Sequence, residues 1–462
     1  MDFKSICSLS TLSLVTTAAC SNLIPQKQKP DIIIIYADDL GYGDLSTYGG
    51  LIPSPNIQRL ADAGIRFTNF YVSAPVSTPS RYSLLTGSYP QRSVHGLVKA
   101  GMPGEPGHID SKETLLPAYL KKAGYRTALF GKWHLGAASK ENFPVHHGFD
   151  VFTGFPDGCI DYFRHTYGTY GKSWYKNDEP FEEEGYSTDL ITNHALGFIQ
   201  EQKEKESPYF IFLAYNAPHF GKSDPEDLPD STIILNKDKY AGFEIANTLQ
   251  VPSGYLKRFS NISDPYKQMY AAMVANMDDN IGRILDELDK NGALENTMIW
   301  FISDNGGYSI SHFGHASNGS LRGEKQLLYE GGIRVPAIVC WKSRIEAHKV
   351  NSQVLCNIDI VPTLAKITGI ETMLNKTAVD GIDISDLLFK NKTISRDLFW
   401  KFPVNNQRAL RRGDWKIYNN ELYNLKADPG EKNNVAGEYP DIYQELDAAW
   451  QKIDEKTSPD YE

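Results

Sequence analysis

Continuous apolar runs recur along the chain and are separated by polar turns and helical stretches. Residues 31–37 read DIIIIYA, so after the first position neither alternate set of side chains is polar. A strand with this pattern is buried on both faces, as in a sheet covered by helices. Similar runs occur at residues 127–130, 209–215, 298–302 and 337–341. Between them, residues 265–288 predict a long helix with Asp264 as its N-cap and Pro265 in its first position.

The alternation of strands and helices predicts an α/β fold with a doubly wound sheet flanked by helices. The pattern changes near residue 375, where short strands are predicted at residues 408–417 and 421–425, joined by Asn419-Asn420, before a helix at residues 441–456. We therefore expect a smaller C-terminal α+β domain with an antiparallel sheet. The predicted boundaries are 29–374 for the large domain and 375–462 for the small one.

Chemically capable side chains follow the apolar runs. They are Asp38 and Asp39, Lys132 and His134, His219, and Asp304 and Asn305. Polar residues often end a strand, but four such groups in one chain favour a shared site, because open α/β sheets bind ligands beyond the carboxyl ends of their strands.

Composition narrows the class of protein. The chain has 462 residues, of which 41% are hydrophobic, and a formal net charge of −10. The length suits one large domain plus a smaller one, and no stretch after the first twenty residues is long enough to cross a membrane. The acidic balance argues against a nucleic-acid partner, which would favour a basic patch.

The first twenty residues predict an export signal. A short apolar run, residues 6–19, follows Lys4 and ends at Thr17-Ala18-Ala19-Cys20. This is a small-residue cleavage site, with Cys20 as a candidate for lipid attachment, although a strict lipobox has Leu where Thr17 stands. A buried terminal helix is the alternative, but the polar linker at residues 26–29 favours export. We expect a periplasmic protein or an outer-membrane lipoprotein that meets the membrane only through this anchor.

Two groups of residues suggest anion and metal chemistry. Ser77 lies at the start of a helix indicated by Pro79, and Arg81 is on the same helical face, so the pair could hold an anion. A helix cap beside a solvated arginine explains these residues equally well. The oxygen ligands of Asp38, Asp39, Asp304 and Asn305 suit Ca²⁺ or Mg²⁺, although both segments also read as turns.

The longer string at residues 77–87, STPSRYSLLTG, resembles the sulfatase signature, in which Cys or Ser precedes x-P-S-R-x-x-L-x-T-G. The segments GKWHLG (131–136), NAPH (216–219), NGSLRGEK (318–325) and EGGIRVP (330–336) are similar to other motifs of that family. The resemblance extends from about residue 29 to about residue 435. It implies an alkaline-phosphatase-like doubly wound mixed sheet, with residues 411–416 and 421–425 in the family's small domain.

By this resemblance, Ser77 is the precursor of formylglycine, and a serine at this position implies a radical sulfatase-maturating enzyme as partner. The implied catalytic residues are Ser77, Arg81, Lys132, His134, His219 and Lys325. The implied ligands of one Ca²⁺ (or Mg²⁺) are Asp38, Asp39, Ser77, Asp304 and Asn305. Asn305 stands where the two-zinc relatives of the superfamily carry a histidine, which favours a single hard metal ion.

The predicted function is therefore sulfate ester hydrolysis on a sulfated carbohydrate. A phosphate or phosphonate monoester hydrolase on the same scaffold, or an unmodified glycan-binding homologue without catalysis, remains an alternative. Residues 155–174, 220–260 and 309–317 are rich in side chains that bind sugars, although many of these aromatic residues also suit a packed core. The chain resembles the N-acetylgalactosamine-6-sulfatase group, and we expect an exo-acting enzyme for a sulfated galactose or hexosamine unit, with a plain arylsulfatase as the fallback. The predicted substrate-binding residues are Arg164, His165, His312 and His315.

Overall fold

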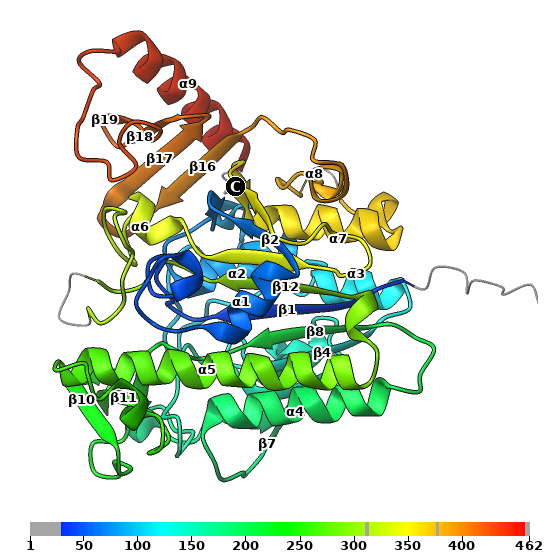
Figure 1. The fold of residues 1–462 in the computed structure, drawn as a ribbon. Helices are drawn as coiled ribbons and strands as arrows, with labels where there is room; N and C mark the ends of the chain where they lie inside the picture. Colours follow the sequence, from blue (N-terminus) through cyan, green and yellow to red (C-terminus); the bar gives the residue numbers. More distant parts are fainter. Residues whose placement is uncertain (1–28, 310–313, 376–377, 458–462) are drawn as a thin grey trace, which may run out of the picture.

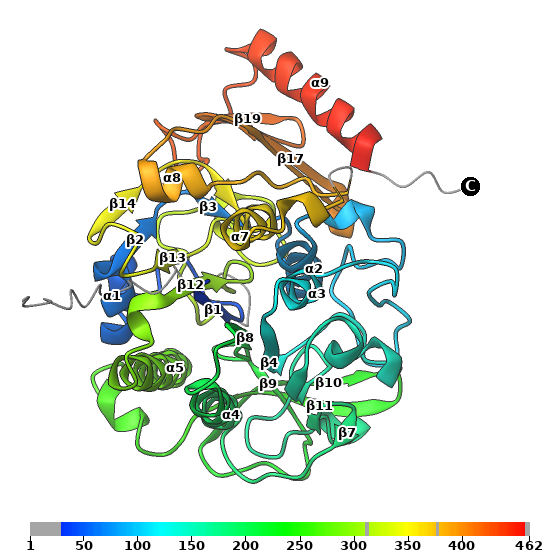
Figure 2. The same cartoon turned by 90° about the vertical axis from the view of Figure 1, so that its right-hand side faces the viewer.

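A ten-stranded mixed sheet forms the centre of the molecule (Figures 1 and 2). The computed structural model describes residues 29–457 except residues 310–313 and 376–377, so the predicted signal peptide and Cys20 lie outside it. The strand order is β14 (Lys349–Asn351), β2 (Gly64–Phe67), β13 (Ala337–Cys340), β12 (Thr297–Ser303), β1 (Asp31–Ala37), β8 (Tyr209–Ala214), β4 (Arg126–Lys132), β5 (Val151–Phe155), β6 (Tyr175–Lys176) and β7 (Glu179–Pro180). The five strands from β12 to β5 are parallel, and β13 runs antiparallel to β12.

Strand β1 is buried on both faces, as its apolar run predicts. Ile32 and Ile34 belong to the hydrophobic core on one side of the sheet, and Ile33 and Ile35 to the core on the other. All four side chains are fully buried. Because successive side chains of a strand point to opposite faces, only a run without polar positions can occupy this place.

Helices cover both faces of the sheet, so the doubly wound prediction is confirmed (Figure 1). On one face lie α1 (Pro55–Asp62), α4 (Ser187–Gln202) and α5 (Pro265–Lys290), and on the other α2 (Ser77–Thr86), α3 (Leu116–Lys122) and α7 (Ile360–Thr368). Helix α5 begins as predicted, since a carboxylate oxygen of Asp264 accepts hydrogen bonds from the backbone N–H groups of Tyr266 (2.9 Å) and Lys267 (3.3 Å).

The C-terminal part is a four-stranded antiparallel sheet with a helix packed on it. It contains β16 (Asp397–Phe402), β17 (Gln407–Arg412), β18 (Trp415–Tyr418), β19 (Glu421–Asn424) and α9 (Pro440–Thr457). The prediction of one strand at residues 408–417 is wrong. Gly413, with φ of 56°, turns the chain between β17 and β18. The second turn, at Asn419 with φ of 49°, lies where Asn419-Asn420 predicted it.

The C-terminal sheet shares its core with the large domain. Leu398 and Trp450 belong to the same hydrophobic cluster as Ile32 and Ile34 of β1. The indole N–H of Trp400 also donates a hydrogen bond to the carbonyl of Val72, at 2.7 Å. The sheet itself begins at Asp397, after α8 (Ser385–Lys390). The two parts are therefore packed as one structure.

Shorter elements complete the described chain. The segment after His219 forms a small antiparallel sheet of β9 (Gly221–Ser223), β10 (Thr232–Tyr240) and β11 (Phe243–Gln250). The described chain also contains a two-stranded parallel pair, β3 (Phe70–Tyr71) with β15 (Leu355–Cys356), and the short helix α6 (Glu330–Ile333). No helix within the described ranges is long and apolar enough to span a membrane.

Candidate active site

The predicted polar residues meet at one edge of the central sheet. Strands β1, β4, β8 and β12 are parallel neighbours, so their carboxyl ends lie together. Asp38, Lys132 and Asp304 stand at the ends of three of these strands, and the turn that contains His219 follows β8. This is the position that the chain order predicts for a ligand site.

Asp38 and Asp39 reach the same point although they are consecutive residues. In a regular strand their side chains would face opposite sides of the sheet. Asp39 adopts φ of 63°, a left-handed conformation, and its backbone N–H donates to Asp304 Oδ1 at 3.0 Å. As a result, carboxylate oxygens of Asp38, Asp39 and Asp304 lie within 4.8 Å of one another, and all three residues are buried. The left-handed conformation of Asp39 ends the strand and brings the three carboxylates together.

The carboxylate cluster fits a hard divalent cation. Burial, followed by the charge of Asp38, raises the pKa of Asp304 above its ordinary value, so a bound cation would favour the ionised carboxylate. Asn305 Nδ2 donates to Asp39 Oδ1 at 2.7 Å. This leaves Asn305 Oδ1 buried and without a hydrogen-bond partner among the described residues. Three carboxylates and one orphaned amide oxygen are the donor set that Ca²⁺ or Mg²⁺ prefers.

Three cationic side chains surround these carboxylates. Lys132 Nζ lies 2.7 Å from Asp38 Oδ2, Lys325 Nζ lies 2.7 Å from Asp39 Oδ2, and Arg81 Nη2 lies 3.1 Å from Asp304 Oδ2. Burial lowers the pKa of Lys132. Burial also acts to lower the pKa of Lys325, but Asp39 and other negative neighbours outweigh it and raise that pKa above its ordinary value. The arrangement concentrates positive charge where an anion could bind.

Ser77 lies between this cation cluster and the carboxylates. It is the first residue of α2 and is 2% exposed. Its Oγ donates to Asp38 Oδ1 at 3.0 Å and accepts from Lys132 Nζ at 3.2 Å. Arg81 is fully buried, so the alternative of a helix cap beside a solvated arginine is wrong. The hydroxyl is fixed inside the charged cluster.

In the two candidate histidines, His219 and His134, different ring nitrogens are bonded to a backbone carbonyl, so a different nitrogen is left free in each. His219 Nδ1 lies 2.6 Å from the carbonyl oxygen of Phe220, which can only accept, so Nδ1 carries the proton and Nε2 faces Asp39 Oδ2 at 3.4 Å. His134 Nε2 contacts the Gly101 carbonyl at 2.9 Å, and its Nδ1 has no partner among the described residues. Burial lowers the pKa of His219 to about 3 and the pKa of His134 well below its ordinary value. Burial therefore favours the neutral form of both rings.

The predicted substrate-binding residues lie in different surroundings. His315 helps to line a small pocket with Asp39 and His219, and its Nε2 has no described partner. Arg164 forms an ion pair at 3.0 Å with the exposed Asp227. His165 is buried, stacks on Trp174 with ring centroids 4.6 Å apart, and its Nε2 lies 3.1 Å from the Gly185 carbonyl. His312 lies outside the described residues.

Sequence reasoning missed the residues that support the site from behind. The Arg81 guanidinium lies 5.2 Å from the centre of the Tyr36 ring, and the Tyr36 hydroxyl and Ser80 Oγ form a 2.9 Å hydrogen bond. Tyr36 therefore holds the helix that carries Ser77. The sequence offered one signal for this role: the Tyr36 hydroxyl is the polar group within the apolar run that follows Asp31 in β1. Asn318 belongs to the quoted motif at residues 318–325 but had no assigned role, and its side chain accepts from Gly307 N and donates to the Gly307 carbonyl.

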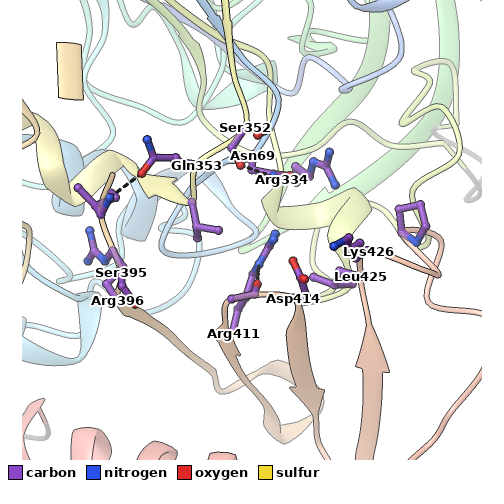
Figure 3. Close-up of a pocket in the computed structure, with 14 residues that line it drawn as sticks. Asn69, Arg334, Ser352, Gln353, Ser395, Arg396, Arg411, Asp414, Leu425 and Lys426 are labelled. Atoms are coloured by element: carbon purple, nitrogen blue, oxygen red, sulfur yellow. Dashed lines mark hydrogen bonds between the residues drawn. The ribbon is translucent and has the colours of Figure 1, made fainter. Parts of the chain in front are cut away.

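A cavity of about 460 Å³ lies at the junction with the C-terminal sheet (Figure 3). None of the candidate catalytic, metal-binding or substrate-binding residues lines it. Arg334, Arg396, Arg411 and Lys426 line it. Most of its positive charge is already partnered. Arg396 pairs with Asp359, and Arg411 Nη1 donates to the Tyr71 hydroxyl. We assign this cavity to the packing of the two parts rather than to the reaction.

Comparison with known proteins agrees with this geometry. A family model described as Sulfatase matches residues 30–370. This chain belongs to the sulfatase family. A second model, described as the C-terminal part of N-sulphoglucosamine sulphohydrolase, matches residues 323–456 and so covers the small antiparallel sheet. The predicted fold and enzyme class are confirmed, and the chain is a sulfatase.

Relatives of this sulfatase match over almost its whole length. The N-acetylgalactosamine-6-O-sulfatase of Bacteroides thetaiotaomicron is 31% identical, with 91% of this chain and 92% of that protein covered. The mouse (Mus musculus) N-acetylgalactosamine-6-sulfatase is 31% identical over 89% of this chain and 74% of its own length. A crystal structure described as Ps i-CgsB in complex with k-i-k-neocarrahexaose superposes with a TM-score of 0.81 at 28% identity, and 94% of this chain and 95% of that one are covered.

Proposed function

We propose that this sulfatase removes sulfate from the end of a sulfated carbohydrate, with a galactose or hexosamine unit as its substrate. The observation that carries the proposal is the position of Ser77 Oγ, held between Lys132 and Asp38 inside a buried cluster of cations and carboxylates. The carbohydrate assignment is supported by the relatives. Two act on N-acetylgalactosamine 6-sulfate by name, and a solved one holds a neocarrahexaose.

Two groups would complete the site. We propose that Ser77 is converted to formylglycine by a radical maturase, and that its hydrate supplies the attacking hydroxyl and a second hydroxyl for release of sulfate. Asp38, Asp39, Asp304, Asn305 and the modified residue 77 would hold one Ca²⁺ or Mg²⁺, which would supply positive charge toward the sulfate oxygens.

The remaining chemistry belongs to side chains of this chain. Lys132, Lys325 and Arg81 would neutralise a bound sulfate in a site closed to bulk water, where preorganised charge has its greatest effect. Each of these cations now pairs with a carboxylate, so a metal ion that took over those carboxylates would free them for the substrate.

The two histidines suit opposite proton transfers. A bound sulfate anion near His219 would raise the pKa of that ring, because an opposite charge favours the protonated form, and His219 Nε2 could then protonate the leaving alcohol. His134, neutral and with a bare Nδ1, suits the acceptance of a proton during sulfate release. Each backbone carbonyl fixes which ring nitrogen is left free, Nε2 in His219 and Nδ1 in His134, and the direction of each transfer depends on the protonation state of that nitrogen.

Export completes the proposal. A glycan substrate outside the cytoplasm fits the signal-like residues 1–20, with Cys20 as the site of a lipid anchor in the periplasm or at the outer membrane. Mass spectrometry of the protein purified from a native-like host should find residue 20 at its N-terminus. Retention of residues 1–19 would refute export by this route.

The function is tested by two measurements on the same preparation. Mass spectrometry of the peptide that contains Ser77 should find the mass of formylglycine in the active protein. A panel of sulfated monosaccharides and disaccharides should be cleaved faster than the corresponding phosphate esters. Rapid cleavage of an aryl sulfate with no turnover of any sulfated sugar would leave a plain arylsulfatase. Faster turnover of the phosphate esters would indicate a phosphohydrolase, and an unmodified, inactive protein that binds the sugars would indicate a binding protein.

A further inference from the structure

Lys222 stands beside the proposed catalytic acid but takes no part in the chemistry described above. It lies on β9, three residues after His219. Its Nζ is 5.2 Å from the centre of the Phe220 ring and 6.0 Å from that of Tyr167. The Phe220 ring in turn lies 4.2 Å from the His219 ring. One aromatic ring therefore separates the Lys222 ammonium from His219.

The Lys222 ammonium differs from the other two lysines of the site. Lys132 and Lys325 each contact a carboxylate at 2.7 Å. No ion pair or hydrogen bond joins the side chain of Lys222 to any described residue, and its contacts are the two aromatic faces. Lysine side chains that leave water are normally paired, because an uncompensated charge is costly to bury. Lys222 is only partly exposed, and among the described residues no carboxylate lies within ion-pair distance of its Nζ.

The surroundings of Lys222 connect it to the sulfate-binding lysine. Burial is the largest cause that lowers the pKa of Lys222. Cys159 and Asp238 partly oppose it, and repulsion from Lys325 adds to it, so the two ammonium groups interact across the same region. A chain of aromatic rings also connects Lys222 with Lys325. Lys325 Nζ lies 5.2 Å from the Tyr308 ring centre, and the Tyr308 and Phe220 rings are 6.4 Å apart. Asp238 is the nearby acid, but it is exposed on β10 and forms no ion pair with Lys222.

We propose that Lys222 binds a second anionic group of the sulfated glycan, a uronate carboxylate or a further sulfate, while the first sulfate lies at Ser77. This specifies the substrate class of the proposed function and rests on it. The aromatic faces of Phe220 and Tyr167 hold the ammonium in place without neutralising it, so its charge remains available to an incoming anion. A dianionic sugar would supply the direct anionic contact that Lys222 lacks, whereas a neutral sugar with one sulfate would leave Lys222 without one.

The test compares Lys222→Met with the wild-type enzyme on three substrates. These are a neutral sugar with one sulfate, a disulfated sugar, and a monosulfated disaccharide with a neighbouring uronate. Methionine keeps the stem that packs on the rings and removes the charge. We expect KM for the dianionic substrates to rise roughly tenfold with kcat little changed, because one charge-assisted hydrogen bond is lost. The neutral sugar should be unaffected. Whichever dianionic substrate responds identifies the source of the anion.

Controls separate a binding role from a structural one. Lys222→Arg should recover most of the preference, and Lys237→Met, at an exposed lysine of β10 in the same small sheet, should behave as wild type. The wild-type preference should weaken at high salt, and the variant's should not. Equal losses on all three substrates, or no change on either dianionic one, would overturn the proposal. If the wild type cleaves no sulfated sugar, the proposed function itself has failed, and this inference falls with it.

Discussion

Single residues of this site are held in conformations that their local structure does not favour. Asp39 occupies a left-handed conformation that few residues other than glycine adopt, and tertiary contacts to Asp304 and Asn305 fix it there. Asn305 keeps a buried carbonyl oxygen without a partner. Strained backbone conformations and buried polar atoms without partners concentrate where a protein binds a ligand. Here both occur around one set of carboxylates.

His219→Ala should slow sulfate esters with basic leaving alcohols far more than activated aryl sulfates. Loss of a general acid typically costs about 10²–10⁴ in rate when the leaving group needs a proton, and little when it does not. The measurement is kcat/KM over a series of esters with increasing leaving-group pKa. His134→Ala serves as comparison: its kcat should fall to a common value for all esters, because sulfate release follows departure of the alcohol, and its kcat/KM should change little. A His219→Ala loss that is independent of the leaving group would assign this ring to sulfate binding.

Removal of the metal should destabilise the folded protein. A ligand present at about 100 times its dissociation constant stabilises the native state by about 2.7 kcal/mol, so a chelator should lower the Tm of the wild type. Asp304→Asn should begin with a lower Tm and respond little to the chelator. Asp264→Asn, at the exposed cap of α5, should respond as wild type does. Elemental analysis that finds stoichiometric zinc in active protein would contradict a site for Ca²⁺ or Mg²⁺.

At the scale of elements, two glycine-rich turns are packed against each other behind the site. A Cβ atom placed on Gly306 would lie 1.8 Å from the Gly331 carbonyl oxygen, and one on Gly331 would lie 2.2 Å from the Gly323 carbonyl oxygen. The Gly306 N–H donates to the Gly332 carbonyl at 3.0 Å. The glycines after Asp304-Asn305 and those of α6 therefore allow two backbones to touch, which sets the position of the metal-binding turn.

Gly306→Ala should lower the stability of the fold and reduce activity together. The added methyl group meets backbone that cannot move away, and overpacking of this kind costs about 1–3 kcal/mol, occasionally more. Gly197→Ala is the matched control. It lies in α4 with open space around its Cβ position, so alanine there should be neutral or stabilise by about 0.5–1 kcal/mol. Chemical denaturation of both variants provides the comparison, and a Gly306→Ala protein as stable as wild type would contradict the close packing.

At the scale of the whole molecule, a buried ionic cluster joins the C-terminal sheet to the large domain. Lys416 Nζ of β18 lies 3.0 Å from Glu330 Oε1 and 2.9 Å from Glu431 Oε1, and its side chain and that of Glu330 are fully buried. Burial acts to raise the pKa of Glu330, but Lys416, Arg411 and Arg334 outweigh it and hold that pKa at about 2. The small sheet thus supplies the countercharge for a carboxylate of α6.

Lys416→Met should destabilise the protein strongly. It leaves Glu330 and Glu431 buried with less positive charge, and breaking a buried ion pair by removal of one partner costs about 3–5 kcal/mol. Lys366→Met, at an exposed pair with Glu371, should cost no more than about 1 kcal/mol. The free energy of unfolding from denaturant titration checks both values. Similar small losses in the two variants would show that the cluster adds little to the junction.

Much of the fold could be predicted because it depends on local patterns. The uninterrupted apolar run of β1 can be satisfied only between two cores, and Asp264-Pro265 specifies the start of α5 whatever its partners. The strand predicted at residues 408–417 failed because it passed over Gly413-Asp414, a two-residue hairpin signal between β17 and β18. The predicted sites at Ser77 and at the carboxylates rested on motif and chain order, which specify residue types but not distances.

By itself, the sequence determined the sheet, its two layers of helices, the edge at which the polar residues gather and the family to which the chain belongs. Only the tertiary structure decided which of those residues touch. Asp39 and Asp304 are 265 positions apart, and their contact depends on two strands becoming neighbours and on one left-handed residue. The same holds for Lys222, which reads as an ordinary polar position until β9 folds and packs its side chain against two aromatic rings. Local patterns report burial and turns, whereas the electrostatics of a site depend on distances between segments that the chain order leaves open.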